Sequence, residues 1–197
     1  MNHKSLAAVA AIALPSLAFA DGHEVAVEFV EGNQITIYSP THATVHTQVE
    51  IEAPAAVVWD VLMDEDKSWS PSFIRFDGPM EEGASVDVTL RDVFGTNNGE
   101  DRTLTFEWSF EEGRRIGWSG PSASGGPFSD NHQFVLMPVD EDTTLFVQSD
   151  DVTSTDTTVT DLSSEGTVGF LQALVTQNYM PFNNALKAEA EKQYQAQ

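Results

Sequence analysis

The 197-residue chain contains no cysteine, so it can form neither disulfides nor thiolate metal sites. The histidines His23, His42, His46 and His132 show none of the spacings typical of metal ligands. The chain also lacks a phosphate-binding G-x-x-x-x-G-K-[ST] loop and a G-x-S-x-G nucleophile elbow. We therefore expect no metal ion and no cofactor.

Basic residues are scarce: nine Lys and Arg oppose 31 Asp and Glu, which gives a net charge of −22. Such a surface repels nucleic acids and anionic lipid headgroups, so we expect no nucleic-acid partner. The acidic residues are scattered and match no calcium-loop spacing. Two interpretations remain, a solvated surface suited to a salty medium and a cation-binding surface, and the spacing favours the first.

Long hydrophobic runs are also absent. The apolar stretch from Leu6 to Leu14 is shorter than the roughly 20 residues that span a bilayer. It follows His3 and Lys4 and precedes Ala18-Phe19-Ala20, the pattern of a cleavable secretory signal. We expect a signal peptide at residues 1–20, cleavage after Ala20, a periplasmic or secreted protein, and no stable membrane insertion. Nothing in the sequence indicates an oligomeric state.

The sequence that follows residue 20 has the length of one domain and begins with β-rich segments. Residues 25–29 and 34–38 flank Glu31-Gly32-Asn33 and predict a hairpin, within an N-terminal extension at residues 21–40. The main domain is expected at residues 41–197. Residues 44–52 alternate between apolar and polar side chains and predict its first, half-buried strand.

Two helical regions interrupt and end the β-rich sequence. Pro54 opens a short helix, and residues 64–69 predict a second short helix or turn. Six strands follow, at residues 73–76, 86–90, 104–110, 116–118, 132–137 and 145–152. A long helix that begins near Asp161 carries an apolar stripe, and Pro181 is expected to kink or divide it. The stripe consists of Val168, Leu171, Val175, Tyr179, Phe182 and Leu186.

This order predicts an α+β fold in which a curved, seven-stranded antiparallel sheet surrounds a long C-terminal helix, with two short helices after the first strand. One helix cannot cover the whole inner face of such a sheet. The space that remains between them is expected to hold a small ligand.

Several motifs resemble a known family. They are Val49 to Leu62 (VEIEAPAAVVWDVL), Trp69 to Phe73 (WSPSF), Ile116 to Gly120 (IGWSG), His132 to Leu136 (HQFVL) and Thr143 to Asp150 (TTLFVQSD). In this order they resemble the SRPBCC (START/Bet v 1-like) superfamily, in particular its polyketide cyclase/dehydratase-like branch, over about residues 43 to 193. The resemblance implies a helix-grip fold with a hydrophobic cavity. Members bind lipids, sterols and polyketides, and some are cyclases or dehydratases.

His132 and Asp150 are the candidate catalytic pair. If the hairpin loop between their strands centres on Glu141, the two residues lie opposite each other, with Cβ atoms roughly 4.5–5.5 Å apart. His132 is an even number of positions from Phe134 on its strand, and Asp150 is an even number of positions from Phe146. All four side chains should therefore lie on one face of the sheet, towards the cavity. An imidazole held by a carboxylate is a plausible general base. The alternative is an internal hydrogen-bonded pair that satisfies buried polar groups.

The ligand contacts are expected to be mostly aromatic. A three-residue loop at residues 112–114 places Trp108 opposite Trp118, where the two indoles stack on a flat ligand or pack in the core. We expect Arg75 either to neutralise an acidic group of the ligand or to form an exposed ion pair. The predicted ligand contacts are Trp69, Phe73, Arg75, Phe106, Trp108, Trp118, Phe134, Phe146, Gln148, Phe170, Leu174 and Asn178.

Two functions are compatible with these residues. A binding module would hold a lipid, a sterol-like molecule or an aromatic, polyketide-like molecule, and it requires only the cavity. A cyclase- or dehydratase-like enzyme requires in addition that His132 and Asp150 converge on one cavity wall. The first hypothesis is preferred, because catalysis depends on two residues and on one assumed register; whether the protein is an enzyme stays open.

Overall fold

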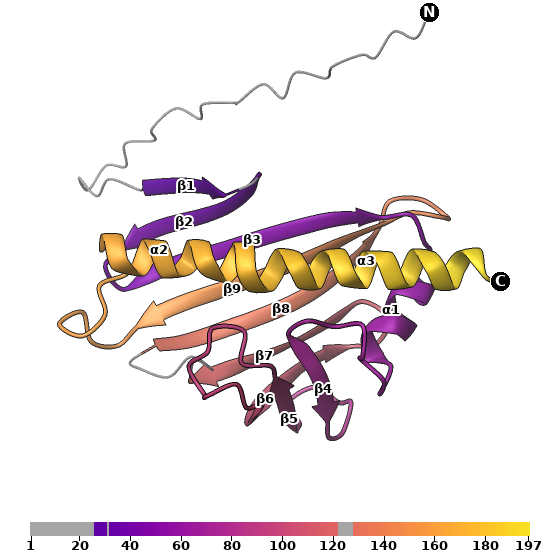
Figure 1. The fold of residues 1–197 in the computed structure, drawn as a ribbon, viewed down its shortest axis with the longest axis horizontal. Helices are drawn as coiled ribbons and strands as arrows, with labels where there is room; N and C mark the ends of the chain where they lie inside the picture. Colours follow the sequence, from indigo (N-terminus) through magenta and orange to yellow (C-terminus); the bar gives the residue numbers. More distant parts are fainter. Residues whose placement is uncertain (1–25, 31, 122–127) are drawn as a thin grey trace, which may run out of the picture.

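The computed structural model describes residues 26–30, 32–121 and 128–197 (Figure 1). The predicted signal peptide at residues 1–20 and His23 lie outside the described residues. No helix in the described part of the chain is both long and apolar enough to cross a membrane.

A single antiparallel sheet of nine strands forms one layer, in the order β1-β2-β3-β9-β8-β7-β6-β5-β4. The long C-terminal helix lies across its inner face (Figure 1). The strands are β1 (Ala26–Val30), β2 (Asn33–Ser39), β3 (His42–Ile51), β4 (Phe73–Asp77), β5 (Ser85–Leu90), β6 (Arg102–Glu111), β7 (Arg115–Pro121), β8 (Phe128–Pro138) and β9 (Thr144–Ser154). The predicted helix-grip architecture is confirmed.

The predicted count of seven strands is wrong, because the N-terminal hairpin joins the sheet. Strand β2 pairs with β3 through partners such as Gln34 and His46. Ile35 and Ile37 of β2 are buried in the core, at 0% and 3% exposure. The hairpin thus has an apolar face to bury, and it does so by extending the sheet beyond β3.

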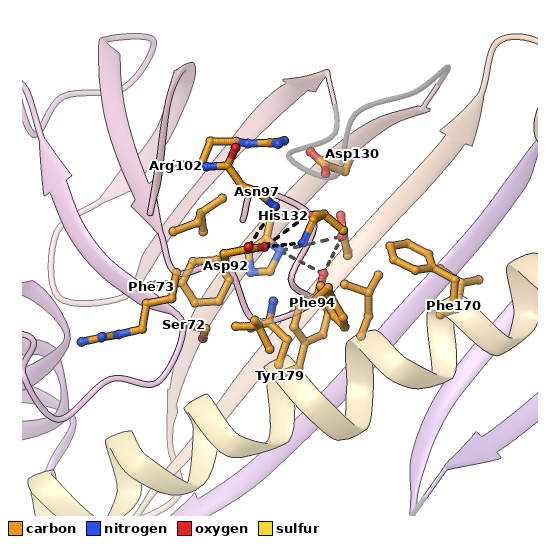
Figure 2. Close-up of a pocket in the computed structure, with 18 of the residues that line it drawn as sticks. Ser72, Phe73, Asp92, Phe94, Asn97, Arg102, Asp130, His132, Phe170 and Tyr179 are labelled. Atoms are coloured by element: carbon orange, nitrogen blue, oxygen red, sulfur yellow. Dashed lines mark hydrogen bonds and ion pairs between the residues drawn. The ribbon is translucent and has the colours of Figure 1, made fainter. Parts of the chain in front are cut away.

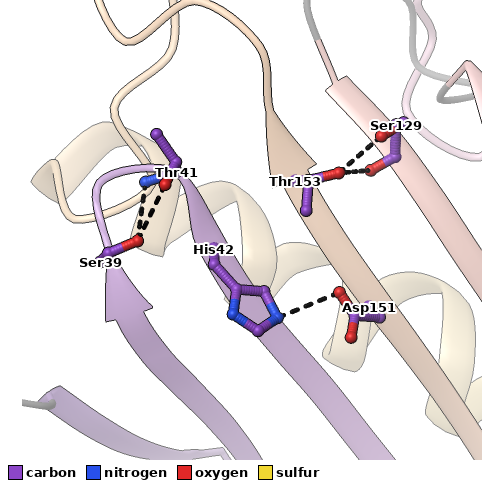
Figure 3. Close-up of polar contacts among 6 residues, drawn as sticks. All are labelled: Ser39, Thr41, His42, Ser129, Asp151 and Thr153. Atoms are coloured by element: carbon purple, nitrogen blue, oxygen red, sulfur yellow. Dashed lines mark hydrogen bonds and ion pairs between the residues drawn. The ribbon is translucent and has the colours of Figure 1, made fainter.

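Exposed polar contacts link neighbouring strands on the outer face of the sheet (Figure 3). His42 Nε2 lies 3.1 Å from Asp151 Oδ1, across the β3–β9 pair. The hydroxyls of Ser129 and Thr153 lie 2.5 Å apart, across the β8–β9 pair. Because these groups are exposed, each contact contributes little stability. Asp151 therefore lies on the opposite face from its neighbour Asp150, which is buried.

Between β3 and β4 the chain forms one short helix, α1 (Ala55–Met63). Of the two alternatives predicted for residues 64–69, a second short helix or a turn, the structure has the turn, so the expected count of two short helices is wrong. The Asp64 carboxylate accepts a hydrogen bond from the Asp66 backbone N–H (3.0 Å), and Asp66 accepts one from Ser68 (3.0 Å). These side-chain contacts replace the backbone bonds of a helix, which is the usual effect of Asp in turns.

The C-terminal helix consists of α2 (Glu165–Ala173), the π-helical segment η1 (Leu174–Tyr179) and α3 (Met180–Gln195). It begins four residues later than Asp161, because Ser164 caps it by accepting a bond from the Thr167 N–H (3.3 Å). The helix is not divided at Pro181, because Tyr179 and Met180 keep right-handed helical backbone angles and η1 continues directly into α3. Pro181 has no N–H to donate, and the change from π-helical to α-helical hydrogen bonding falls just before it. Such π segments are frequent at functional sites.

Lys67 is buried in the turn that follows α1, with 4% exposure. Its ammonium donates a hydrogen bond to the backbone carbonyl of Asp64 and lies 4.9 Å from the centre of the Phe76 ring. Burial lowers the pKa of Lys67 from 10.5 to about 8, although the negative charges of Asp64 and Glu65 act in the opposite direction. The folded protein therefore releases this proton more readily than the unfolded chain does.

We predict that Lys67 makes the protein more stable as the pH rises from about 8 to about 10.5. In that window the unfolded chain binds more protons at Lys67 than the folded chain, so the free energy of unfolding increases with pH, by at most about 3 kcal/mol. Denaturant unfolding of the native protein and of Lys67→Met at several pH values checks this. The variant should lack the increase, and parallel profiles would contradict the assignment.

Candidate functional site

A cavity of about 120 Å³ lies between the inner face of the sheet, the loop at residues 91–101 and the α2–η1 part of the helix (Figure 2). One group of lining residues is apolar: Phe73, Leu90, Val93, Phe94, Trp118, Val152, Phe170, Leu171 and Leu174. The other group is polar: Ser72, Arg91, Asp92, Thr96, Asn97, Arg102, Asp130, His132, Asp150, Asn178 and Tyr179.

His132 and Asp150 lie directly opposite each other on β8 and β9, so the predicted register is confirmed. Both side chains line the cavity and are buried, with 3% and 4% exposure. His132 Nδ1 is 3.8 Å from Asp150 Oδ2, which is longer than a hydrogen bond. The two groups are thus neighbours in a buried site without a direct strong bond.

Tyr179 completes this group from the η1 segment. Its hydroxyl donates a 2.7 Å hydrogen bond to Asp150 Oδ2 and lies 3.5 Å from His132 Nδ1. Burial raises the pKa of Tyr179 well above its ordinary value, and the negative charges of Asp150 and Asp130 and the bond to Asp150 add to this effect. Tyr179 therefore remains a protonated donor at neutral pH.

The imidazole of His132 is fixed by its other neighbours. Its ring stacks on the Trp118 indole, with centres 4.5 Å apart and planes 9° from parallel. Its Nε2 lies 3.2 Å from the amide nitrogen of Gln148. With this amide orientation Gln148 donates, so Nε2 accepts and the proton of a neutral ring resides on Nδ1, on the side of Asp150.

A buried polar network continues from this group towards α3. Asn183 donates a 2.9 Å bond to the Thr47 hydroxyl, which donates to the Gln148 backbone carbonyl at 3.2 Å. One oxygen each of Asp150, Gln148 and Asn183 has no hydrogen-bond partner within the described part of the chain. This network therefore leaves three buried acceptor oxygens without a donor among the described residues.

The loop at residues 91–101 is organised around the Asp92 carboxylate. It accepts bonds from the backbone N–H groups of Thr96 (2.7 Å), Asn97 (2.8 Å) and Gly99 (2.8 Å). Desolvation alone would raise the pKa of Asp92, but these bonds outweigh it and the pKa lies below its ordinary value. The carboxylate thus stabilises this cavity wall at neutral pH, and the contribution is lost as the pH falls through that lowered pKa.

The predicted ligand contacts divide into two sets. Phe73, Trp118, Phe170, Leu174 and Asn178 line the cavity. Trp69, Phe106, Trp108, Phe134, Phe146 and Gln148 do not line it.

Arg75, the twelfth predicted contact, also does not line the cavity. Arg75 is exposed and forms a 2.8 Å ion pair with Asp77, in agreement with the second interpretation of this residue. Trp108 and Trp118 do lie opposite each other, as predicted, with centres 6.0 Å apart and planes 7° from parallel.

An aromatic cluster explains why several predicted ligand contacts do not line the cavity. It comprises Trp69, Phe73, Phe134, Phe146 and Phe182, and Phe182 of α3 contacts the other four rings. The Phe134 and Phe182 rings stack with centres 5.1 Å apart. Side chains thus fill the part of the space between sheet and helix that the sequence had suggested for a ligand.

A sequence model of the family described as "Polyketide cyclase / dehydrase and lipid transport" matches residues 42–191. The chain belongs to this family. The match falls within the SRPBCC superfamily that the motifs had suggested, and it begins at β3, so the β1–β2 hairpin precedes the family region. None of the curated proteins matches the chain.

Solved structures show the same fold at low sequence identity. The Zhui aromatase/cyclase from Streptomyces sp. R1128 superposes with a TM-score of 0.58 and 22% identity, over 77% of this chain and 95% of that chain. A START superfamily protein from Mycobacterium smegmatis superposes with a TM-score of 0.53 and 16% identity, over 76% and 98% of the two chains. For Ara h 8.0201 the TM-score is 0.53 and the identity 11%, over 77% and 99%.

Sequence reasoning missed Tyr179 as a site residue and missed the loop at residues 91–101. Tyr179 was counted in the apolar stripe of the last helix, although a buried hydroxyl requires a partner. That requirement was the available signal, because inward-facing His132 and Asp150 were already expected. The loop offered only turn chemistry, and its position at the cavity follows from long-range packing. Among the described residues, no group of three or more His, Asp or Glu is placed to hold a metal ion.

Proposed function

We propose that the protein binds a small hydrophobic ligand in the cavity between the sheet and the C-terminal helix. The observation that carries this proposal is the lining, in which nine aromatic and aliphatic side chains lie beside polar groups of the 91–101 loop, β8, β9 and η1. Sites for small molecules have this composition. The relatives in the family, described by polyketide cyclisation and lipid transport, support a lipid, sterol-like or aromatic, polyketide-like ligand.

We also propose that the protein is exported and acts in the periplasm or outside the cell after cleavage at Ala20. The support is the sequence of residues 1–20, with its basic start, short apolar run and small residues at positions 18 and 20. The large negative charge suits a well-solvated surface.

Purification of the protein from its own source, separately from the exported fraction and from the cells, tests both proposals. Native mass spectrometry gives its mass with any bound molecule, and the mass after denaturation gives the N-terminus. We expect a chain that begins at residue 21 and a stoichiometric apolar molecule. A full-length chain confined to the cell would contradict export, and a protein that remains empty and takes up no added apolar molecule would contradict binding.

A second candidate function is catalysis in the same cavity by a cyclase- or dehydratase-like enzyme. The observation that favours it is the convergence of His132, Asp150 and Tyr179 on one cavity wall. In this case His132 Nε2 would exchange its Gln148 amide partner for a bound substrate and act as a general base, and Tyr179 would hold Asp150 in place. The Zhui structure belongs to an aromatase/cyclase, which supports this alternative by analogy.

For this alternative we predict that His132→Ala lowers turnover of an accepted substrate by about 10²–10⁴-fold, the usual contribution of a general base. Steady-state kinetics over a panel of polyketide-like substrates measures the effect. The control is His42→Ala, which removes a half-exposed histidine from the outer face of the same sheet. Equal turnover by the two variants would contradict a catalytic role of His132.

A further inference from the structure

We infer that the cavity takes a neutral ligand with one aromatic ring, about the size of phenol. This ligand donates a hydrogen bond to the polar wall, which is the part of the lining formed by His132, Asp150 and Tyr179. This inference rests on the proposed binding function and specifies its ligand. It departs from the lipid or multi-ring molecules that the family description suggests.

The volume of the cavity limits the size of the ligand. A cavity of about 120 Å³ is somewhat smaller than an engineered protein cavity of about 150 Å³ that accommodates benzene. The aromatic cluster limits extension of the cavity towards α3, because Phe134, Phe146 and Phe182 are fully buried and contact one another. A second fused ring or an acyl chain that extended in this direction would have to displace these side chains, and close-packed interiors resist such changes.

The walls of the cavity carry flat aromatic side chains. Phe73 lines the cavity on the sheet side, and Phe170 lines it from the helix (Figure 2). Trp118 of β7 is also part of the lining. Phe94, from the 91–101 loop, contacts Phe170 with ring centres 5.9 Å apart. Flat aromatic side chains on several sides favour a flat aromatic guest through offset and edge-to-face contacts.

The Asp150 carboxylate can accept a further hydrogen bond. Tyr179 already uses its hydroxyl proton on Asp150 Oδ2, and Asp150 Oδ1 has no partner in the described part of the chain. A buried carboxylate oxygen without a partner is costly, and a ligand hydroxyl that donates to it would remove that cost. The polar wall is therefore suited to a ligand that donates.

Charged groups of both signs line the cavity. Burial raises the pKa of Tyr179 and the negative charges of Asp150 and Asp130 add to this effect, so an anionic group would be disfavoured in this part of the cavity. Arg91 and Arg102 lie in the same lining as these aspartates, and a cationic ligand would lose its hydration there. A neutral hydroxyl avoids both penalties.

The test is a calorimetric titration series at neutral pH with phenol, toluene, benzoate, benzylamine, 1-naphthol and dodecanoate. We expect phenol to bind most tightly, and toluene, benzoate and benzylamine to bind at least tenfold more weakly. We expect 1-naphthol and dodecanoate not to bind. If 1-naphthol or dodecanoate binds more tightly than phenol, the size inference fails while the proposed function stands. If none of the six binds, the proposed function fails as well.

Variants of the polar wall test the hydrogen bond. Asp150→Asn should weaken the binding of phenol at least tenfold and leave the affinity for toluene unchanged. The matched control is Asp151→Asn, the next residue on β9, which is exposed on the outer face and should leave both affinities unchanged. Tyr179→Phe releases Asp150 Oδ2 and should bind phenol at least as tightly as the native protein, so it tests the same bond if Asp150→Asn fails to fold. Equal affinities for phenol and toluene in the native protein, or a loss of phenol binding in Tyr179→Phe, would overturn the assignment.

Discussion

Phe182→Ala is expected to lower the free energy of unfolding by about 3–5 kcal/mol and to enlarge the ligand cavity. Phe182 is fully buried and contacts four other aromatic rings, so truncation removes its burial and leaves a void in the aromatic cluster. That void adjoins Phe73, which also lines the cavity. Ligands that the native protein excludes should then fit.

Two measurements on Phe182→Ala check this prediction. Denaturant unfolding gives the loss of stability, and titration with 1-naphthol should show binding that the native protein lacks. The control is Phe29→Ala, because Phe29 is 50% exposed and its truncation should change stability by less than about 1 kcal/mol. A variant that loses stability but still rejects 1-naphthol would show that the cluster does not set the ligand size.

Gly117→Ala is expected to destabilise the protein by about 3 kcal/mol or more, and to disturb His132. A Cβ atom on Gly117 would lie 2.3 Å from the backbone oxygen of His132 and 2.5 Å from the Gln133 side chain. Backbone cannot yield as a flexible side chain does, so β7 and β8 must separate at this point. Since Trp118 and His132 are paired next to it, their stack should open.

Thermal unfolding and the side-chain NMR signals of His132 measure this effect. Gly169→Ala is the matched control, because Gly169 lies in α2 with open space around its Cβ position. That change should stabilise the helix by roughly 0.5–1 kcal/mol. If Gly117→Ala is as stable as the native protein and keeps the His132 signals, the close packing of β7 against β8 would be refuted.

The sequence allowed the strand pairing around the site to be predicted because period-two alternation and a short loop determine a register. The pairing of His132 with Asp150 followed from the loop centre, and the pairing of Trp108 with Trp118 from a three-residue turn. Both patterns are local along the chain, so they can be recognised in the sequence without a structure. The stripe of the last helix was predicted for the same reason.

Other features depend on packing between distant segments. Ile35 and Ile37 indicated a strand, but the sheet edge that it joins could not be read from residues 25–38. Phe134, Phe146 and Phe182 were correctly placed facing inward, yet whether inward aromatic side chains line a cavity or fill it depends on three-dimensional fit. Turn chemistry at Asp64 and Asp66 overrode the predicted second helix.

The most direct test of ligand binding in this cavity is an NMR titration of the native protein with phenol, read through the methyl and aromatic signals. We predict contacts between phenol protons and the methyl groups of Leu171 and Leu174, together with shifts of the Trp118 and His132 rings. The ring of Phe146, which does not line the cavity, should show no contact. Contacts confined to the outer face of the sheet, or no contact at saturating phenol, would contradict the account.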